Sequence, residues 1–305
     1  MNIPEILNEL KIPYWDEGKN VKKGWHNIRC PFCGDKSNHG GISPNGFYKC
    51  WRCEGGTLLN ALSLITKFPK FELLKILKKY NYSLPSVEIS KRAQHSLQSI
   101  PGGKLTTMHL NYLLGRDFHP FALERKYGLK GTGMVGRWKD RDFSYRLIIP
   151  VKDMDGNLIS FLGRDITGKQ ELRYKNCPAE LSAKPVKETL YNIEAAKNFD
   201  TVVVCEGVFD LWRIDLTQSV ATFGIELSQT QINLLSMFRK IIFAFDPEDK
   251  AQQNAKTYAQ RLSGGGSDVY TLDLRRVGAG FEKDLADLNH AELQTVLAEI
   301  SDLLV

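Results

Sequence analysis

The amino-acid sequence predicts a multi-domain protein of the α/β class. Its 305 residues exceed the usual single-domain length of about 100 to 200 residues, so two or three folded units are expected. Two Cys-x-x-Cys pairs lie close together near the N-terminus, and the last third alternates β-branched or aromatic runs with helical patterns. We therefore expect a small cysteine-containing module at the N-terminus and a mainly parallel sheet towards the C-terminus.

Composition and charge narrow the class of protein. Hydrophobic residues at 42% and charged residues at 25% are typical of a folded globular chain. Residues 1–104 contain 16 Lys and Arg against 8 Asp and Glu, residues 105–200 contain 16 against 12, and residues 201–305 contain 9 against 15. The basic first two thirds suit a polyanionic partner, and the acidic last third suits bound cations. The alternative is that these differences are solvated surface charge.

Membrane insertion and secretion are not indicated. No uninterrupted apolar run approaches the roughly 18 residues that a membrane-spanning helix needs, and the first residues are partly acidic and lack the apolar core of a signal peptide. Six cysteines are too few for a disulfide scaffold in a chain of this length. We expect a cytoplasmic protein with no membrane partner.

The N-terminal unit is expected to span residues 1–80. An amphipathic pattern predicts a helix over Ile3–Leu10, aromatic residues predict a strand over Gly46–Cys50, and leucines at helical spacing predict a helical stretch over Thr57–Tyr80. Residues 81–104 are polar, lack periodicity and contain Pro and Gly breakers, so they are expected to form a linker.

The remaining chain is expected to form two halves of a larger domain. Residues 105–200 form the basic half, which begins with helices over 106–127 that are interrupted near Arg116–Pro120 and continues with a hairpin turning at Asp155-Gly156-Asn157. Residues 201–305 form the α/β half with a C-terminal helix, and its strands are expected to be mainly parallel. The expected strands of both halves are Tyr145–Val151, Leu158–Arg164, Thr201–Cys205, Ser219–Thr222, Lys240–Phe245 and Asp268–Leu272.

The four paired cysteines predict one structural zinc ion. Cys30-Pro-Phe-Cys33 and Cys50-Trp-Arg-Cys53 are separated by 16 residues, a spacing typical of two knuckles around one tetrahedral Zn²⁺. Four thiolates leave no open coordination position, so the metal would hold the fold and not catalyse. Competing interpretations are a redox-active Cys-x-x-Cys pair, or His26 or His39 in place of one cysteine.

Aromatic and basic residues surround these cysteines. The aromatic residues Trp25, Phe47, Tyr48 and Trp51 are interleaved with basic residues, which are Lys22, Lys23, Arg29, Lys36, Lys49 and Arg52. Aromatic faces stack on unpaired bases while cations follow the phosphates, so this combination suits single-stranded nucleic acid. The alternative is that the aromatic residues form the small core of the module, and we expect at least half of them to do so. The better candidates for contacting nucleic acid are Lys49, Arg52 and His26.

Acidic residues follow the predicted strands of the last third. Glu206 follows the first strand, Asp210 lies in the first turn of the next helix, Asp246-Pro-Glu-Asp249 follows a later strand, and Asp284 and Asp287 form a third cluster. Such strand ends meet at one edge of an open sheet, where the acids would repel unless cations neutralised them. Paired carboxylates that bind Mg²⁺ suit nucleotidyl transfer. The alternative for each acid is capping of a helix N-terminus.

The acidic residues, taken in order, resemble the Toprim module shared by bacterial DnaG-type primases, topoisomerases and some nucleases. Glu206 matches the glutamate of that family, Asp246 matches the first acid of its pair, and Ala221-Thr-Phe-Gly224 resembles the loop between them. The family pair is usually Asp-x-Asp followed by a basic residue and alanine. The resemblance therefore implies that the second acid is Glu248, or Asp249 if one residue is inserted.

The resemblance to primases extends from about Arg29 to Leu288. Residues 26–65 resemble a primase zinc-binding domain, in the four-cysteine form that is closer to phage primases, and residues 112–128 and 146–178 resemble the first part of the polymerase domain. A topoisomerase would need a large further domain for its catalytic tyrosine. The resemblance implies template or nucleotide binding by Arg116, Arg146, Arg164, Arg173, Lys175 and the two alternatives Lys184 and Lys187.

The function implied by this resemblance is that of a DNA primase, which joins ribonucleoside triphosphates into short RNA primers on single-stranded DNA with two or more Mg²⁺ or Mn²⁺ ions. The zinc module would select the start site. The implied location is the cytoplasm of a bacterial or phage-infected cell, with a phage or mobile-element origin favoured. The sequence contains no Walker A pattern, so a separate replicative helicase is expected as a partner. The implied catalytic acids are Glu206, Asp246, and Glu248 or Asp249, with Asp210, Asp284 and Asp287 in support.

Two other functions fit the same residues. A Toprim nuclease would use the same acids to hydrolyse a phosphodiester. A non-catalytic replication protein that binds single-stranded DNA would carry a degenerate site, which the irregular Asp246-Pro-Glu-Asp249 segment suggests.

Overall fold

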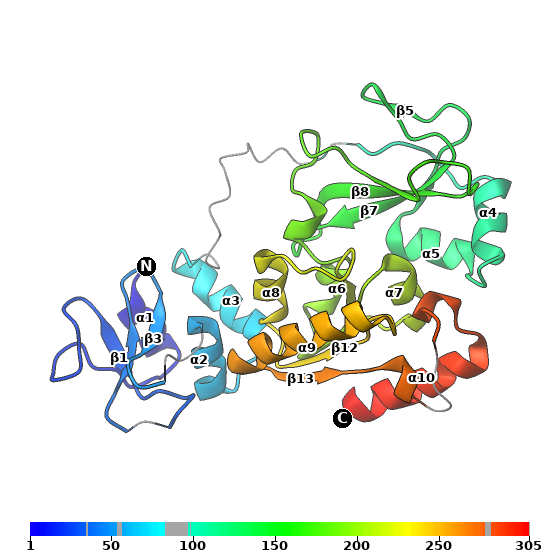
Figure 1. The fold of residues 1–305 in the computed structure, drawn as a ribbon. Helices are drawn as coiled ribbons and strands as arrows, with labels where there is room; N and C mark the ends of the chain where they lie inside the picture. The colour runs from blue at the N-terminus through cyan, green and yellow to red at the C-terminus, as the bar shows by residue number, and fades with distance from the viewer. Residues whose placement is uncertain (35, 54–56, 83–96, 98, 278–281, 305) are drawn as a thin grey trace.

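The computed structural model covers residues 1–305 and describes all of them except 35, 54–56, 83–96, 98, 278–281 and 305. Figure 1 shows three parts: an N-terminal module, a middle subdomain built on an antiparallel sheet, and a C-terminal subdomain built on a parallel sheet. Most of the expected linker over 81–104 lies outside the described residues. None of the helices described is long and apolar enough to cross a lipid bilayer.

The N-terminal module contains a three-stranded antiparallel sheet in the order β1-β2-β3. Its strands are β1 (His26–Ile28), β2 (Gly40–Ile42) and β3 (Tyr48–Cys50). The expected first helix is confirmed as α1 (Ile3–Glu9), which begins where the Asn2 side chain accepts a hydrogen bond from the backbone N–H of Glu5.

The helical stretch expected over Thr57–Tyr80 is two helices and not one. These are α2 (Leu58–Thr66) and α3 (Lys70–Lys79). Lys67 ends α2 in the left-handed region, with φ 61°, and Pro69 has no N–H to continue the helical hydrogen bonds. The leucine spacing spans both helices, so the periodic pattern alone did not reveal this break.

The N-terminal module packs on the C-terminal subdomain. Buried apolar residues of α1, α2 and α3 belong to one continuous cluster with those on one face of the parallel sheet. At this contact Lys70 is 4% exposed, and its Nζ donates to the carbonyls of Ser236 and Phe238 and to Ser267 Oγ. Burial lowers the pKa of Lys70 to about 7. The three acceptors replace the water that this ammonium group loses on burial.

The middle subdomain begins with two helices, α4 (Thr107–Leu114) and α5 (Pro120–Tyr127). The break between them was expected. Its sheet has the order β4-β7-β8-β9, and the long strands β7 (Arg146–Lys152) and β8 (Leu158–Asp165) form the predicted hairpin. Leu97, from the segment expected as a linker, packs under this sheet. The shorter strands are β4 (Lys130–Gly131), β5 (Arg137–Trp138), β6 (Arg141–Asp142) and β9 (Tyr174–Asn176).

The last third forms the predicted parallel sheet, in the order β11-β10-β12-β13. Alternate residues of a strand enter opposite cores, because successive side chains point to opposite faces. Helices α8 (Gln229–Leu235) and α9 (Asp249–Gly264) cover one face, and α7 (Val208–Ile214) and α10 (His290–Leu304) pack on the other. The remaining elements are β10 (Thr201–Cys205), β11 (Ser219–Ala221), β12 (Lys240–Phe243), β13 (Asp268–Thr271), α6 (Ile193–Ala196), and the 3₁₀ turns η1 (Val186–Glu188), η2 (Leu274–Arg276) and η3 (Leu285–Asp287).

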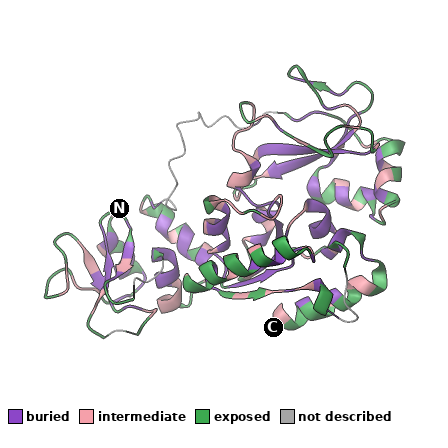
Figure 2. Cartoon of the chain, in the orientation of Figure 1, coloured by how far each residue is buried: buried purple, intermediate pink, exposed green. Residues whose placement is uncertain are grey.

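This topology places the acidic segments beside the middle subdomain. β10 and β12 are parallel neighbours, so the segments that follow them meet at the same edge of the sheet. Strands β7, β8 and β12 are buried, as Figure 2 shows. The acids therefore lie on segments that are fixed by buried strands at one end.

Candidate active site

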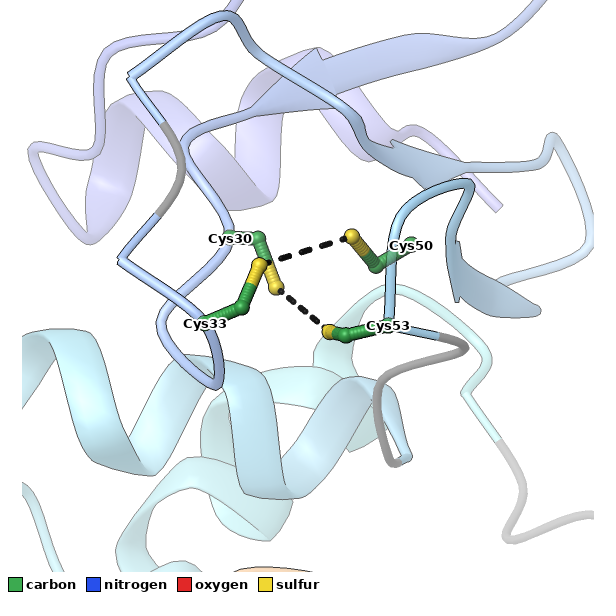
Figure 3. Close-up of side chains that lie close together, drawn as sticks. All are labelled: Cys30, Cys33, Cys50 and Cys53. Carbon is green, nitrogen blue, oxygen red and sulfur yellow. Dashed lines mark hydrogen bonds between the residues drawn. The ribbon is translucent and has the colours of Figure 1, made fainter.

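The four predicted zinc ligands come together in the N-terminal module, as Figure 3 shows. Cys30 Sγ lies 3.7 Å from Cys53 Sγ, and Cys33 Sγ lies 3.9 Å from Cys50 Sγ. A tetrahedron of sulfurs about 2.3 Å from one zinc ion has edges of about 3.8 Å, so the spacing fits Zn²⁺, whereas a disulfide requires about 2.05 Å. Within the described part of the chain the metal-binding group contains these four cysteines, without His26 or His39.

Two aromatic residues near this cluster remain exposed. Trp51 is 44% exposed and Phe47 is 60% exposed, whereas Tyr48 is buried. The Trp25 and Trp51 rings lie 5.4 Å apart, and Lys49 Nζ lies 5.9 Å from the centre of the Trp51 ring. Part of the aromatic set therefore forms the core of the module, and part is open to a ligand.

The predicted acids from three segments line one cavity of about 400 Å³. Glu206 follows β10, Asp246 follows β12, and Asp210 lies in the first turn of α7. Asp284 and Asp287 enter from the segment around η3. The cavity also contains Arg116, Arg164, Arg173 and Lys187, so the structure brings most of the predicted acidic and basic residues to one place.

Burial and mutual repulsion raise the pKa values of these acids. Burial is the main cause for each: it raises the pKa of Glu206 to about 7, that of Asp210 to about 6 and that of Asp246 to about 9. These values include the repulsion from nearby carboxylates, which acts in the same direction as burial, and burial also raises the pKa of Asp284. A bound cation would stabilise such a cluster of carboxylates, because its positive charge offsets the repulsion that otherwise favours their protonation.

The oxygen atoms of the acids fit divalent metal ions. Asp246 Oδ1 is buried and has no hydrogen-bond partner, which is costly for a carboxylate oxygen unless a cation binds it. Glu206 Oε1 accepts a hydrogen bond from the Asp246 backbone N–H at 3.0 Å, which holds the two acids together. In contrast, the Asp210 oxygens accept from the N–H groups of Gly207 at 2.9 Å and Ala286 at 3.2 Å. Asp210 thus supports the site.

The second acid of the Toprim pair falls just outside this cavity. Asp249 Oδ1 accepts from Arg275 Nη1 at 2.7 Å, so its carboxylate is directed to another partner. Glu248 is exposed at the start of α9, and its charge raises the pKa values of Glu206 and Asp246. Of the two alternatives, Glu248 is the one that is electrostatically coupled to the acidic cluster.

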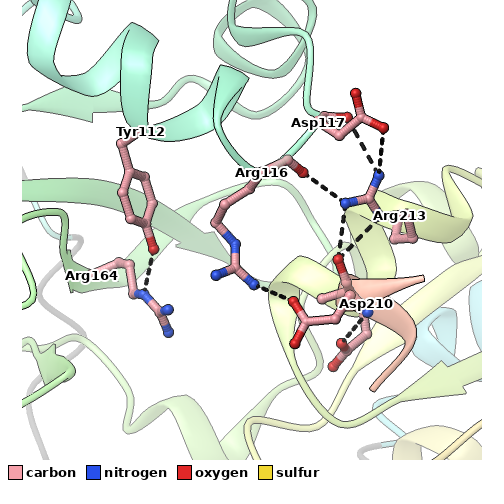
Figure 4. A network of polar contacts seen from close by, with 8 residues as sticks. Tyr112, Arg116, Asp117, Arg164, Asp210 and Arg213 are labelled. Carbon is pink, nitrogen blue, oxygen red and sulfur yellow. Dashed lines mark hydrogen bonds and ion pairs between the residues drawn. The ribbon is translucent and has the colours of Figure 1, made fainter. Parts of the chain in front are cut away.

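Two predicted arginines on the opposite wall are held by other side chains, as Figure 4 shows. Arg116 Nη2 donates to Asp287 Oδ1 at 2.9 Å, and Arg164 Nε donates to the Tyr112 hydroxyl at 2.9 Å. The Arg164 guanidinium also lies 4.7 Å from the ring centre of Tyr174 and 5.1 Å from that of Phe209. These contacts fix the orientation of the guanidinium groups.

Not every predicted basic residue reaches the cavity. Arg146 is 3% exposed and does not line the cavity, and its Nη1 donates to the carbonyls of Gly163 and Leu172, so its guanidinium joins β7 to its neighbours. Lys175 Nζ donates to the Asp142 carbonyl and does not line the cavity. Lys187 lines the cavity whereas Lys184 does not, which favours Lys187 between the two alternatives.

Some cavity residues were missed by sequence reasoning. Tyr174, Phe209 and Phe223 line the cavity, and Tyr112 lines an adjoining one. Tyr112 and Phe209 lie in helical stretches where an aromatic residue is usually part of the core. The sequence therefore contained no signal that separated these aromatic residues from ordinary core residues.

Two protein-family models match the chain. Residues 108–197 match the N-terminal domain of the DNA primase catalytic core, and residues 203–288 match the Toprim-like family. The two matches follow one another along the chain and meet at the cavity described above.

Individual proteins give the same result. A DNA primase of Aquifex aeolicus is 26% identical over 351 residues, which covers 99% of this chain and 70% of that protein. A DNA primase of Synechocystis is 34% identical over 154 residues, which covers 47% of this chain and 24% of that protein. The crystal structure of the zinc-binding and RNA polymerase domains of the Aquifex aeolicus primase superposes with a TM-score of 0.54 at 22% identity, covering 100% of this chain and 82% of that one, which shows a shared fold.

The order of the parts agrees with these comparisons. A four-cysteine cluster precedes the primase-core domain, and the Toprim-like domain follows it. The expected phage or mobile-element origin stays a prediction. The chain is therefore similar to DnaG-type DNA primases across its primase-core and Toprim-like domains, and it shares their fold.

Proposed function

We propose that this chain is a DNA-directed RNA polymerase that makes short RNA primers on single-stranded DNA. The observation that carries this proposal is one cavity in which clustered acids face a row of arginines. The acids suit the metal ions of nucleotidyl transfer, and the arginine forks suit the phosphate oxygens of a template and a triphosphate. The matched primase families support the same assignment.

The proposed reaction joins the 3′-oxygen of the growing primer to the α-phosphorus of a ribonucleoside triphosphate and releases pyrophosphate. Mg²⁺ or Mn²⁺ would activate the attacking hydroxyl and neutralise charge on the leaving group. Glu206 and Asp246 would hold these ions, with Asp284 nearby on the same acidic wall. Arg116, Arg164 and Arg173 would orient the phosphates. Tyr112 already fixes Arg164, so little ordering is needed when the nucleotide binds.

We further propose that Glu248 is the second acid of the Toprim pair. Glu248→Gln should then lower the rate of primer synthesis by about tenfold or more. The substitution removes a carboxylate that binds the metal ion or lies next to its ligands. Asp249→Asn removes only an exposed ion pair with Arg275 and should leave the rate nearly unchanged. Steady-state rates of the two matched variants at limiting Mg²⁺ provide the measurement. A larger loss in the Asp249 variant would reverse the assignment.

The function itself is tested with purified protein, single-stranded DNA, ribonucleoside triphosphates and Mg²⁺. The wild-type chain should make short RNA products, and the double variant Glu206→Gln plus Asp246→Asn should make none. Asp268→Asn is the control, because Asp268 is an exposed acid of the same subdomain that pairs with Arg239. If primer synthesis survives the double substitution, this mechanism is wrong.

The same preparation separates the rival functions. Cleavage of labelled DNA in the absence of nucleotides would favour a Toprim nuclease. DNA binding without Mg²⁺-dependent nucleotide binding would favour a non-catalytic replication protein. The ordered arginine wall opposite the acids favours the polymerase over both, because a triphosphate and a template together carry many phosphates.

The zinc module is proposed to contact the template. The exposed Trp51 ring, with Lys49 beside it, offers a stacking surface and a cation for an unpaired strand. Arg52 lies in the same cysteine knuckle and remains a candidate contact. Recruitment of a separate helicase and a cytoplasmic location stay predictions.

A further inference from the structure

The peptide group of Ala286 is held on both sides by side chains of α7. Its N–H donates to Asp210 Oδ1 at 3.2 Å, and its carbonyl accepts from Arg213 Nε at 3.2 Å and Arg213 Nη2 at 2.9 Å. Asp210 and Arg213 are three residues apart, so they lie on the same side of the helix. This double attachment fixes η3, which begins just after Asp284 and ends at Asp287, against α7.

Arg213 also reaches the middle subdomain. Its Nη2 donates to the Arg116 carbonyl at 2.7 Å and its Nη1 donates to the Asp117 carbonyl at 3.4 Å, as Figure 4 shows. The guanidinium lies 4.5 Å from the ring centre of Phe118, and its side chain is 9% exposed. One buried guanidinium therefore joins three carbonyl groups from two facing walls of the cavity.

Arg213 does not itself line the cavity, whereas Arg116, Asp284 and Asp287 do. We propose that Arg213 is a positioning residue that sets the distance between the arginine wall and the acidic wall of the metal site. This inference deepens the proposed function and rests on it for the identity of the reaction. It concerns residues of this chain and can be measured with the metal alone.

The residue type fits this role. A guanidinium presents five donors in a planar fork, which suits several carbonyls arranged around it, whereas an ammonium group is a point donor that cannot span them together. The direct contact from Arg116 Nη2 to Asp287 Oδ1 depends on the same spacing. Loss of Arg213 should therefore displace Asp284 and Arg116 together.

The test measures Mn²⁺ binding to the wild-type chain, Arg213→Gln and Arg213→Lys. Electron paramagnetic resonance reports the bound Mn²⁺, and neither nucleotide nor DNA is present. We expect Arg213→Gln to weaken Mn²⁺ binding about tenfold, as is usual when a partner that orients metal ligands is removed, with Arg213→Lys intermediate. In primer synthesis, the Mg²⁺ concentration for half-maximal rate should rise by the same factor, and saturating Mg²⁺ should restore part of the rate.

Two controls separate positioning from general destabilisation. Arg261→Gln removes an exposed arginine that donates to Gln229 and should leave Mn²⁺ affinity unchanged. Ile300→Val loosens the core under α10 and should lower the melting temperature, and Ile300 does not line the cavity. If Arg213→Gln lowers the melting temperature as Ile300→Val does but keeps wild-type Mn²⁺ affinity, Arg213 is only structural. If Arg213→Gln does not fold, the Arg213→Lys result decides.

The outcomes also distinguish the two proposals. A wild-type chain that makes no primers but binds Mn²⁺, with weaker binding in Arg213→Gln, would refute the proposed function and support the positioning role. If the wild-type chain makes primers and Arg213→Gln has the same Mg²⁺ dependence and Mn²⁺ affinity as the wild type, the proposed function is supported and the positioning role is refuted. Absence of Mn²⁺ binding to the wild-type chain would overturn the inference.

Discussion

Asp246→Asn is expected to abolish primer synthesis while making the metal-free protein more stable. The activity should fall by about a thousandfold, because several kcal/mol of transition-state stabilisation depend on the metal ligands and each 1.36 kcal/mol is a factor of ten. The stability gain has a separate cause. Asp246 is half-buried beside Asp210, Glu206 and Asp284, and its charge is unfavourable there unless a cation is bound.

The difference in stability between the metal-free Asp246→Asn variant and the metal-free wild type should grow with pH. The pKa of Asp246 is raised from its ordinary value of 3.8 to about 9, so the folded protein binds this proton more tightly than the unfolded chain. The resulting stabilisation is complete below the ordinary pKa and is lost as pH rises towards the folded-state pKa. The asparagine variant has no such loss. Its advantage over the wild type should therefore increase between about pH 5 and about pH 8 in the absence of metal.

Thermal unfolding in a chelator, followed by circular dichroism at both pH values, measures this difference. Addition of Mg²⁺ should raise the melting temperature of the wild type more than that of the variant, because the ion binds only the folded site. Asp140→Asn serves as the exposed control, since its ion pair with Arg137 is solvated. A destabilised metal-free Asp246→Asn variant, or a difference that does not depend on pH, would contradict the electrostatic account.

Removal of the zinc ligand Cys33 is expected to unfold the N-terminal module. Cys33→Ser should reduce bound zinc from one ion per chain to almost none, because a structural Zn²⁺ contributes about 10 to 16 kcal/mol to the folding of small zinc domains. Cys33 is exposed, so the substitution removes little packing besides the metal. Elemental analysis for zinc and limited proteolysis within residues 1–82 would follow the change.

The consequences should extend beyond the module. The apolar core of α1, α2 and α3 is continuous with one face of the parallel sheet, so unfolding of the module should expose that face and lower the melting temperature of the remaining chain. Cys177→Ser is the control for zinc content and should keep one bound zinc ion, because Cys177 is a thiol of the middle subdomain outside the zinc cluster. Retention of zinc by Cys33→Ser would rule out the four-cysteine site.

Much of the local structure followed from the sequence. The β-branched runs around Val202 and Ile241 predicted strands of a parallel sheet, because alternate residues must enter cores on both faces of such a sheet. The spacing of the two Cys-x-x-Cys pairs predicted the zinc cluster, because each knuckle aims two sulfurs at one point. Placing Glu206 and Asp246 at one sheet edge followed from the predicted parallel direction of the strands, and the structure then shows that β10 and β12 are neighbours.

The tertiary structure decided how charged side chains are used. Glu248 and Asp249 are adjacent at the start of α9, and Arg275, from a distant segment, directs Asp249 away from the acids. The sequence resemblance implied ligand binding by Arg146, but in the structure its guanidinium donates hydrogen bonds to carbonyls of two other segments. Arg213 gave no sequence signal at all. A strand or a knuckle is set by near neighbours in the chain, whereas the direction of a long charged side chain is set by partners that only the fold brings within hydrogen-bonding distance.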